Sequence, residues 1–354
     1  MGQFLQEIFR ICFFLTGVLL VAATLLSAVR TFVLPRSAQD RLSKIVFRSM
    51  RWIFNFRLRA SRSYLDRDRI MAFYAPVSLM TLLPTWYMLV MFGFAMMYRA
   101  LGEPTWYLAI RESVSSVTTL GFEPADGILR TGLAFTEAII GLILVALLLG
   151  YLPAMYSAFS RRETAVTLLE VRAGDPPSAV VMIKRYYRIQ GMDKLNDLWR
   201  TWENWFAEIE ESHTSLSALV FFRSPQPGHS WVTASGAVLD AAGLILTVVD
   251  TPYDAQAALT IRAGYLALRH IADFFNFGYD PNPKPTDPIS ITRAEFDAAC
   301  ADLSSSGVPL VADRDKAWRA YSGWRVNYDR VLLALARITM APTAPWSSDR
   351  PPLD

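Results

Sequence analysis

The sequence predicts an all-α membrane protein with three transmembrane helices, followed by a helical cytoplasmic domain. Three observations lead to this fold class. Hydrophobic residues make up 53% of the 354 residues, above the roughly 50% of soluble domains. Three apolar runs are long enough to cross a bilayer. After residue 160, apolar residues recur at helical spacing between charged ones.

The charge and the cysteine content exclude several classes of protein. The net charge of +3 is too small to favour nucleic acid as a partner. Cys12 and Cys300 lie far apart, and neither they nor the three histidines have the spacing of a disulfide framework or a zinc site. We therefore expect no metal and no cofactor. No Ser–His–Asp grouping or paired-carboxylate motif predicts an enzyme.

The first predicted span covers residues 11–29, within an N-terminal segment at residues 1–34. Its roughly 19 uncharged residues are enough for a helix to cross about 30 Å of hydrocarbon. A cleaved signal peptide is the alternative. Its apolar core is usually only about 7–15 residues long and follows a basic start, whereas Glu7 and Arg10 precede this run.

A basic and partly interfacial segment is predicted at residues 35–70. Residues 30–69 contain eleven Lys or Arg against three Asp, and such an excess beside a span marks the cytoplasmic side. Residues 44–59 have the composition of a helix that lies among anionic lipid headgroups; the alternative is a basic connector that packs on the protein. The apolar residues are Ile45, Trp52, Ile53 and Phe56, and the arginines among them are Arg48, Arg51, Arg57 and Arg59.

Two further spans are predicted at residues 71–98, where Pro84 favours a kink, and at residues 133–159. If residues 30–69 lie inside, the N-terminus lies outside and the chain after Arg161 is cytoplasmic. We expect a multi-pass protein of the plasma (inner) membrane. A later apolar run at residues 234–249 is only about 16 residues long and contains an Asp, so it predicts a buried helix of the soluble part; the alternative is a fourth span, which would place the C-terminus outside.

The connection between the second and third spans, residues 99–131, is too apolar for a solvated loop. Residues 104–119 favour a helix, and the run Thr-Thr-Leu-Gly-Phe overlaps its end. A helix that re-enters the membrane and doubles back must bury its backbone in protein or expose it to a water-filled cavity. Gly121 permits a positive φ, which lets successive carbonyls point to one side and replace the hydration shell of an ion. The pattern therefore predicts a re-entrant pore helix and a filter loop.

This order of elements resembles the pore module of the potassium-channel superfamily, over about residues 71–160. The family's filter is Thr-Val-Gly-Tyr-Gly, commonly preceded by another Thr and followed by Asp. The resemblance implies a selectivity filter for monovalent ions and, since one loop does not encircle an ion, a homotetramer. The matching residues are Thr118, Thr119, Leu120, Gly121 and Phe122, with Glu123 at the position of the family's second Gly.

Glu123 and Pro124 depart from the family pattern. A Glu does not adopt the backbone conformation of that Gly cheaply, so the resemblance does not imply strict potassium selectivity. Four copies of Glu123 facing the axis would form an acidic ring at the external mouth. The alternative is that Glu123 turns away from the axis and pairs with Arg111 or Arg130.

Three ionisable residues of the pore module form a second group of candidates. Arg111 and Glu112 stand where the family usually has aromatic residues that brace the filter, and Glu137 lies near the start of the third span. Ionisable residues at membrane depth are usually paired. We expect an ion pair between Arg111 and Glu137; the alternative is that Arg111 extends to the outer interface.

A gate is predicted near the cytoplasmic end of the third span. Gly150 and Pro153 favour a loosened helix there. Tyr151 and Met155 are one turn apart, and if they face the axis they form a hydrophobic constriction. The alternative is that both side chains take part in ordinary helix packing.

Residues 161–341 predict a helical cytoplasmic domain, and the Pro- and Ser-rich residues 342–354 predict a disordered tail. No strand–GxGxxG–helix unit indicates a nucleotide-binding domain. The leading functional hypothesis is a homotetrameric ion channel of the potassium-channel type with an atypical, weakly selective filter, opened by an inner-helix gate that is coupled to the cytoplasmic domain. The alternatives are an anion-conducting pore on the same scaffold and a non-conducting membrane sensor or anchor.

Overall fold

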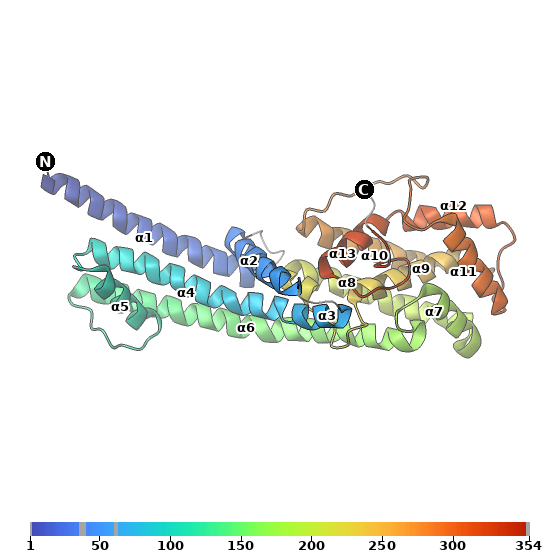
Figure 1. Cartoon of the computed structure of the whole chain (residues 1–354), viewed down its shortest axis with the longest axis horizontal. Coiled ribbons are helices and arrows are strands. Elements are labelled where there is room, and N and C mark those ends of the chain that lie inside the picture. Colours follow the sequence, from blue (N-terminus) through green and yellow to red (C-terminus); the bar gives the residue numbers. More distant parts are fainter. Residues whose placement is uncertain (1, 35–39, 60–62, 352–354) are drawn as a thin grey trace. The chain divides into compact units, whose positions relative to one another are not determined.

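The computed structural model describes residues 2–34, 40–59 and 63–351, and these residues form helices joined by loops, with one isolated β-bridge between Val249 and Leu310 (Figure 1). The all-α prediction is confirmed. Three helical stretches are long and apolar enough to cross a membrane, at Phe4–Phe32, Tyr64–Ala100 and Ile128–Ala173. These three stretches fit a membrane-embedded protein.

The chain divides into two compact units. Unit 1 comprises Met1–Ala60 and Phe73–Tyr156, and unit 2 comprises Ser61–Ala72 and Ser157–Asp354. The basic segment expected at 35–70 therefore contributes one helix to each unit. Its residues 35–39 and 60–62 lie outside the described part of the chain.

Among its described residues, unit 1 contains four helices and the first part of a fifth. They are α1 (Gly2–Phe32), α2 (Arg41–Leu58), α4 (Tyr74–Ala100), α5 (Trp106–Val117) and α6 (Ile128–Ala173). α1 and α4 are in backbone contact at Gly17 and Gly93, since a Cβ atom on Gly17 would lie 2.5 Å from the carbonyl oxygen of Gly93. Small residues allow this close approach of apolar helices.

α6 is longer than the predicted span of 133–159. Its 46 residues extend over about 69 Å at 1.5 Å per residue, more than a bilayer requires, and the helix continues from unit 1 into unit 2. It ends at Ala173, and the next residue, Gly174, has φ of 83° and donates its amide to the carbonyl of Glu170 over 2.8 Å. A glycine in the left-handed region is a common helix stop.

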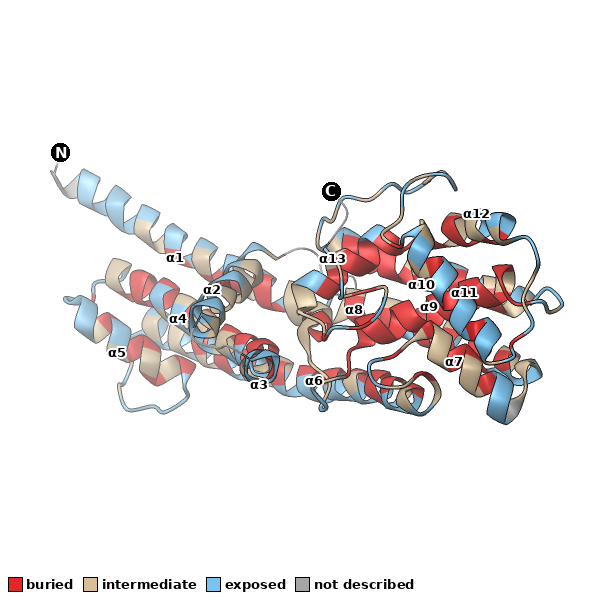
Figure 2. Cartoon of the chain, turned by 45° about the vertical axis from the view of Figure 1, so that its right-hand side comes forward, coloured by how far each residue is buried: buried red, intermediate tan, exposed pale blue. Residues whose placement is uncertain are grey.

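Unit 2 is a helical domain packed around α9 (Trp231–Thr247), which is buried almost throughout (Figure 2). This confirms that the apolar run at residues 234–249 belongs to a buried helix. The other α-helices are α3 (Tyr64–Ala72), α7 (Ala179–Arg185), α8 (Leu195–Ser215), α10 (Ala255–Phe274), α11 (Arg293–Ser305), α12 (Arg314–Arg325) and α13 (Asp329–Thr339). Short helical turns lie at Tyr186–Gln190, Met192–Lys194 and Ser217–Phe221.

The prediction of a disordered tail is wrong for residues 342–351; residues 352–354 lie outside the described part. Ala344 and Ser347 are buried, and the Trp346 ring lies 5.9 Å from the ring of Tyr321. The Trp346 carbonyl accepts a hydrogen bond from Arg325. The tail is ordered because its aromatic ring and its carbonyl groups find partners on the helical domain.

Candidate functional site: the loop between α5 and α6

The position of the loop follows from how α5 packs. The Thr105 side chain caps its start by accepting from the amide of Leu108 over 3.2 Å. At its end, the Val117 carbonyl lies so close to α6 that a Cβ atom on Gly141 would be 2.1 Å from its oxygen. α5 lies within the predicted 104–119 helix, and its last turn is held directly against α6.

The amides that follow α5 turn back toward its last turn. Leu120 and Gly121 both donate to the Ser115 carbonyl, over 3.0 and 3.2 Å, and Thr119 donates to the Ser116 carbonyl over 2.9 Å. The Glu123 amide donates to the Ser115 hydroxyl over 2.9 Å. Ser115 thus anchors both ends of the Leu120 to Glu123 turn.

The carbonyl groups of the same peptides point the other way. In a planar trans peptide, the C=O of one residue is directed opposite to the N–H of the next. With the amides of 119, 120, 121 and 123 aimed at α5, the carbonyls of 118, 119, 120 and 122 point away from it. Within the described part of the chain, no hydrogen bond ends on the carbonyl oxygens of residues 118–122, and all five residues are exposed.

Two residues within the 118–122 part of the loop have a positive φ. Gly121 has φ of 67°, as the predicted return of the chain requires, and Thr119 has φ of 57°. For a β-branched residue this conformation is an outlier, at a cost of about 1–3 kcal/mol, and such strain clusters at functional sites. Two hydrogen bonds hold Thr119 in this conformation: its own amide donates to the Ser116 carbonyl, and the amide of Leu120 donates to the Ser115 carbonyl.

Charged side chains beside the loop form two groups. Arg111 pairs with Glu123 over 2.7 Å. Arg130 at the start of α6 bridges Glu103 and the buried Glu112, with its Nε 3.2 Å from Glu112 Oε1. Glu123 therefore has the partner that the alternative interpretation gave it.

The predicted ion pair between Arg111 and Glu137 is wrong. Glu137 is fully buried and accepts hydrogen bonds from Ser113 on α5 and, over 3.1 Å, from Tyr98 on α4. Arg111 instead contacts Glu123. The carboxylate of Glu137 thus joins α4, α5 and α6 through hydroxyl groups, a role that spacing in the sequence does not reveal.

The predicted gate residues fall on two faces of α6. Tyr151 is only 7% exposed and Met155 only 2%, and the Tyr151 ring lies 4.6 Å from that of Phe32 on α1. Both side chains are packed within the chain, so their assignment to an axial constriction is wrong and the packing alternative holds. Gly150 and Pro153 lie on the exposed side.

That exposed side of α6 is a continuous stripe. Among the exposed residues of this stretch, seven recur at steps of four and three, as on one face of a helix. We call them the α6 stripe: Phe135, Ile139, Leu142, Ala146, Leu149, Pro153 and Tyr156. Their heptad spacing was present in the sequence and was the signal that could have identified this face.

Unit 2 holds the C-terminal part of α6 through Arg162. This buried guanidinium donates to the carbonyls of Leu219 and Phe222, over 2.8 and 2.7 Å, and lies 3.2 Å from Nε2 of His213. Burial and the neighbouring Arg162 hold the pKa of His213 well below its usual 6.5. His213 is therefore neutral, with Nε2 accepting from Arg162.

The adjacent Arg223 holds α3, the helix that precedes α4 in the chain. It contacts Asp68 on α3 and donates to the carbonyls of Thr339 and Met340 at the end of α13, over 2.7 and 3.1 Å. The turn formed by residues 217–223 is thus bonded to α6 on one side and to α3 on the other. Both helices belong to stretches that are long and apolar enough to cross a membrane.

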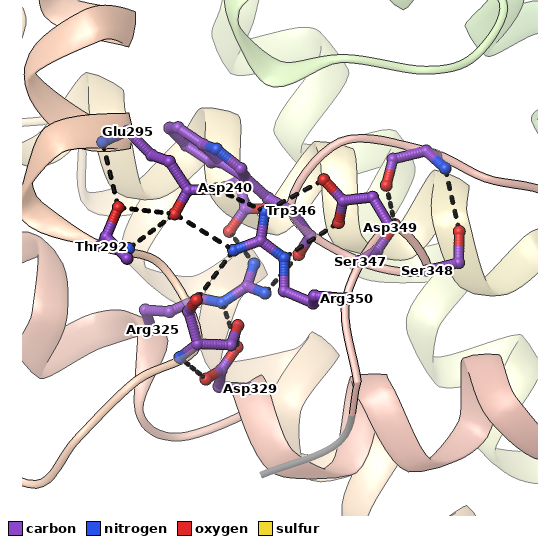
Figure 3. A network of polar contacts seen from close by, with 12 residues as sticks. Asp240, Thr292, Glu295, Arg325, Asp329, Trp346, Ser347, Ser348, Asp349 and Arg350 are labelled. Atoms are coloured by element: carbon purple, nitrogen blue, oxygen red, sulfur yellow. Dashed lines mark hydrogen bonds and ion pairs between the residues drawn. The ribbon is translucent and has the colours of Figure 1, made fainter.

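A second buried network ties the tail to unit 2 (Figure 3). Arg325 is fully buried, contacts Asp240 on α9, and lies 2.8 Å from Asp329. Tyr328 donates to Asp240 over 2.8 Å. Burial raises the pKa of Asp240, although Arg325 acts in the opposite direction. These contacts are structural, since each carboxylate is matched by donors.

Unit 2 also contains a cavity of about 950 Å³ between α6 and α8. Its charged lining is mixed, with Arg161, Arg172 and Lys194 against Asp197 and Glu208, so it does not favour a ligand of either charge. Within the described residues, no three His, Cys, Asp or Glu side chains converge as metal ligands do.

No family model, curated protein or solved structure matches the chain.

Proposed function

We propose that four copies of this chain form a cation-conducting pore of the potassium-channel type, with an atypical and weakly selective filter at residues 118–122. One observation carries the proposal: the loop amides bond back to α5 while the carbonyls point away from it and accept no hydrogen bond among the described residues. Carbonyl oxygens arranged in this way replace the water around a cation. The Thr119 hydroxyl adds a further oxygen ligand.

The proposed tetramer follows from the single loop. One loop offers carbonyls from one side only, so a complete coordination shell needs further copies around an axis. The α6 stripe supports this arrangement, because it leaves one helical face for sister subunits.

We assign the constriction of the gate to this stripe, at Leu149 and Tyr156, in place of Tyr151 and Met155. The N-terminus then lies outside and unit 2 in the cytoplasm.

The charges beside the loop favour cations over anions. An anion path needs a cationic group whose charge is not already balanced, and the two arginines beside the loop, Arg111 and Arg130, are each paired with carboxylates. Glu123, held by Arg111, is not free to complete an outer filter. Loss of that outer site supports weaker discrimination between potassium and sodium.

The proposal is tested by ion flux into liposomes that contain the full-length protein. Liposomes loaded with KCl and placed in potassium-free medium should take up protons through an uncoupler as potassium leaves, and NaCl-loaded liposomes should behave similarly. Native mass spectrometry of the same sample should give a tetramer. Absence of cation flux from folded tetramers, or a chloride flux in its place, would overturn the proposal.

A further inference from the structure

α2 has two opposite faces, and one of them is already occupied. Tyr74, the first residue of α4, packs its ring 6.3 Å from Phe47 and 5.8 Å from Phe54, and its hydroxyl donates to the Phe47 carbonyl over 3.2 Å. Asp40 caps the start of α2 and accepts from Ser27 on α1 over 2.7 Å. These contacts fix α2 against both neighbouring helices of unit 1.

The opposite face of α2 is apolar and exposed. Trp52 is 72% exposed and Phe56 67%, and Ile45 and Ile53 are exposed as well. At about 100° per residue these four side chains lie within one sector, roughly opposite Phe47 and Phe54. A helix face that is in contact with water rarely carries exposed Ile, Trp and Phe together, so this face marks an interaction surface.

The charges of α2 have one sign. The helix contains Arg41, Lys44, Arg48, Arg51 and Arg57 and no Asp or Glu. Asp40, the acid that precedes the helix, is already bonded to the helix start and to Ser27, and Arg41, Arg48 and Arg57 are exposed. The partner of the exposed face must therefore present both an apolar layer and negative charge.

We propose that α2 lies on an anionic phospholipid surface, with Ile45, Trp52, Ile53 and Phe56 at the acyl boundary and the exposed Arg41, Arg48 and Arg57 on lipid phosphates. α1 ends at Phe32 before it and α4 begins at Tyr74 after it, and both are apolar enough to span. A helix joined to two spans and fixed against them lies at the membrane surface. Trp is enriched there because its ring is apolar and its N–H is polar.

This inference goes beyond the proposed pore, since it depends on the spans and not on conduction. It also predicts a lipid preference. Each basic residue near an anionic surface contributes about 1 kcal/mol, which corresponds to about five-fold in binding. Loss of two arginines from α2 should therefore weaken the preference for anionic lipid about 25-fold.

The test uses spin labels on the full-length protein in nanodiscs. Ser49 lies in the middle of the exposed apolar face, and Asn55 lies about 120° away around the helix; both are exposed. Cys12 is exposed and is replaced by Ser, whereas Cys300 is buried. In anionic nanodiscs, a label at Ser49→Cys should be relaxed by oxygen, which concentrates in lipid, and protected from a water-soluble nickel chelate. The matched label at Asn55→Cys should show the reverse.

The lipid preference is read from the same label. The ratio of immersed to water-exposed Ser49→Cys label should fall in zwitterionic nanodiscs. It should fall about 25-fold in anionic nanodiscs when Arg48→Gln and Arg57→Gln are combined. A label at position 49 that is accessible to the nickel chelate would overturn the proposal. Protection from both reagents would assign the face to a protein or a second copy, and equal immersion in both lipids would remove the anionic requirement.

Discussion

Gly121 and Gly127 form a matched pair for testing the role of the filter loop. Both have a positive φ, 67° and 87°, and a Cβ atom added to either meets nothing within 4 Å. Alanine at either position therefore adds backbone strain and no clash. The left-handed region costs an L-residue about 1–2 kcal/mol, so four copies impose about 4–8 kcal/mol on a tetramer. Only at Gly121 is this strain applied to the residues whose carbonyls we assign to the ion.

The assay compares Gly121→Ala with Gly127→Ala in planar bilayers. We expect Gly121→Ala to lose conductance or to change its permeability ratio for potassium over sodium, because the loop relaxes and the carbonyls of 119 and 120 move off the axis. Gly127→Ala should keep both properties, and the two variants should unfold at similar temperatures. Equal effects on conduction, or none from either, would refute the assignment of residues 118–122 to the ion path.

Three further predictions concern single side chains. Glu123→Gln leaves Arg111 without its partner beside the loop, so cation conductance should fall; an unchanged conductance and reversal potential would place this pair away from the ion path. His213 is neutral when folded and protonates when unfolded, so the stability of unit 2 should fall below about pH 6.5, by up to about 1.4 kcal/mol per pH unit. His213→Gln should reduce that slope in thermal unfolding of the full-length chain, and an identical slope would assign it to other groups. Arg325→Met leaves Asp240 and Asp329 buried without their cation, which should cost about 3–5 kcal/mol and expose the tail to limited proteolysis; an intact, resistant tail would contradict this.

Hydropathy and residue spacing predict which helices form. They do not predict which side of each helix packs against the rest of the chain. The three candidate spans and the burial of α9 follow from composition and length alone, because each helix must match its surroundings along its whole extent. The span predicted at residues 133–159 does not show that α6 continues through Glu163 and the polar residues that follow, because hydropathy reports the apolar part of a helix only. No hydrophobic signal marks where it stops before Gly174.

The errors at the site have a common cause, which is tertiary contact between residues distant in sequence. Tyr151 faces inward because Phe32 of α1 is there to receive it, and Glu137 is satisfied by Ser113 and Tyr98 rather than by an arginine. The left-handed conformation of Thr119 depends on hydrogen bonds that the loop amides donate to carbonyls in the last turn of α5. None of these partners is identified by a local pattern.

The central claim is that the carbonyls of residues 118–122 conduct cations, and the reversal potential of the wild-type protein tests it most directly. The full-length protein is placed in a planar bilayer with a tenfold gradient of KCl, and chloride is then replaced by a bulky anion. The account predicts a reversal potential near the potassium equilibrium value, unaffected by the anion exchange, and a clear current when sodium replaces potassium. A reversal potential that follows chloride would contradict it.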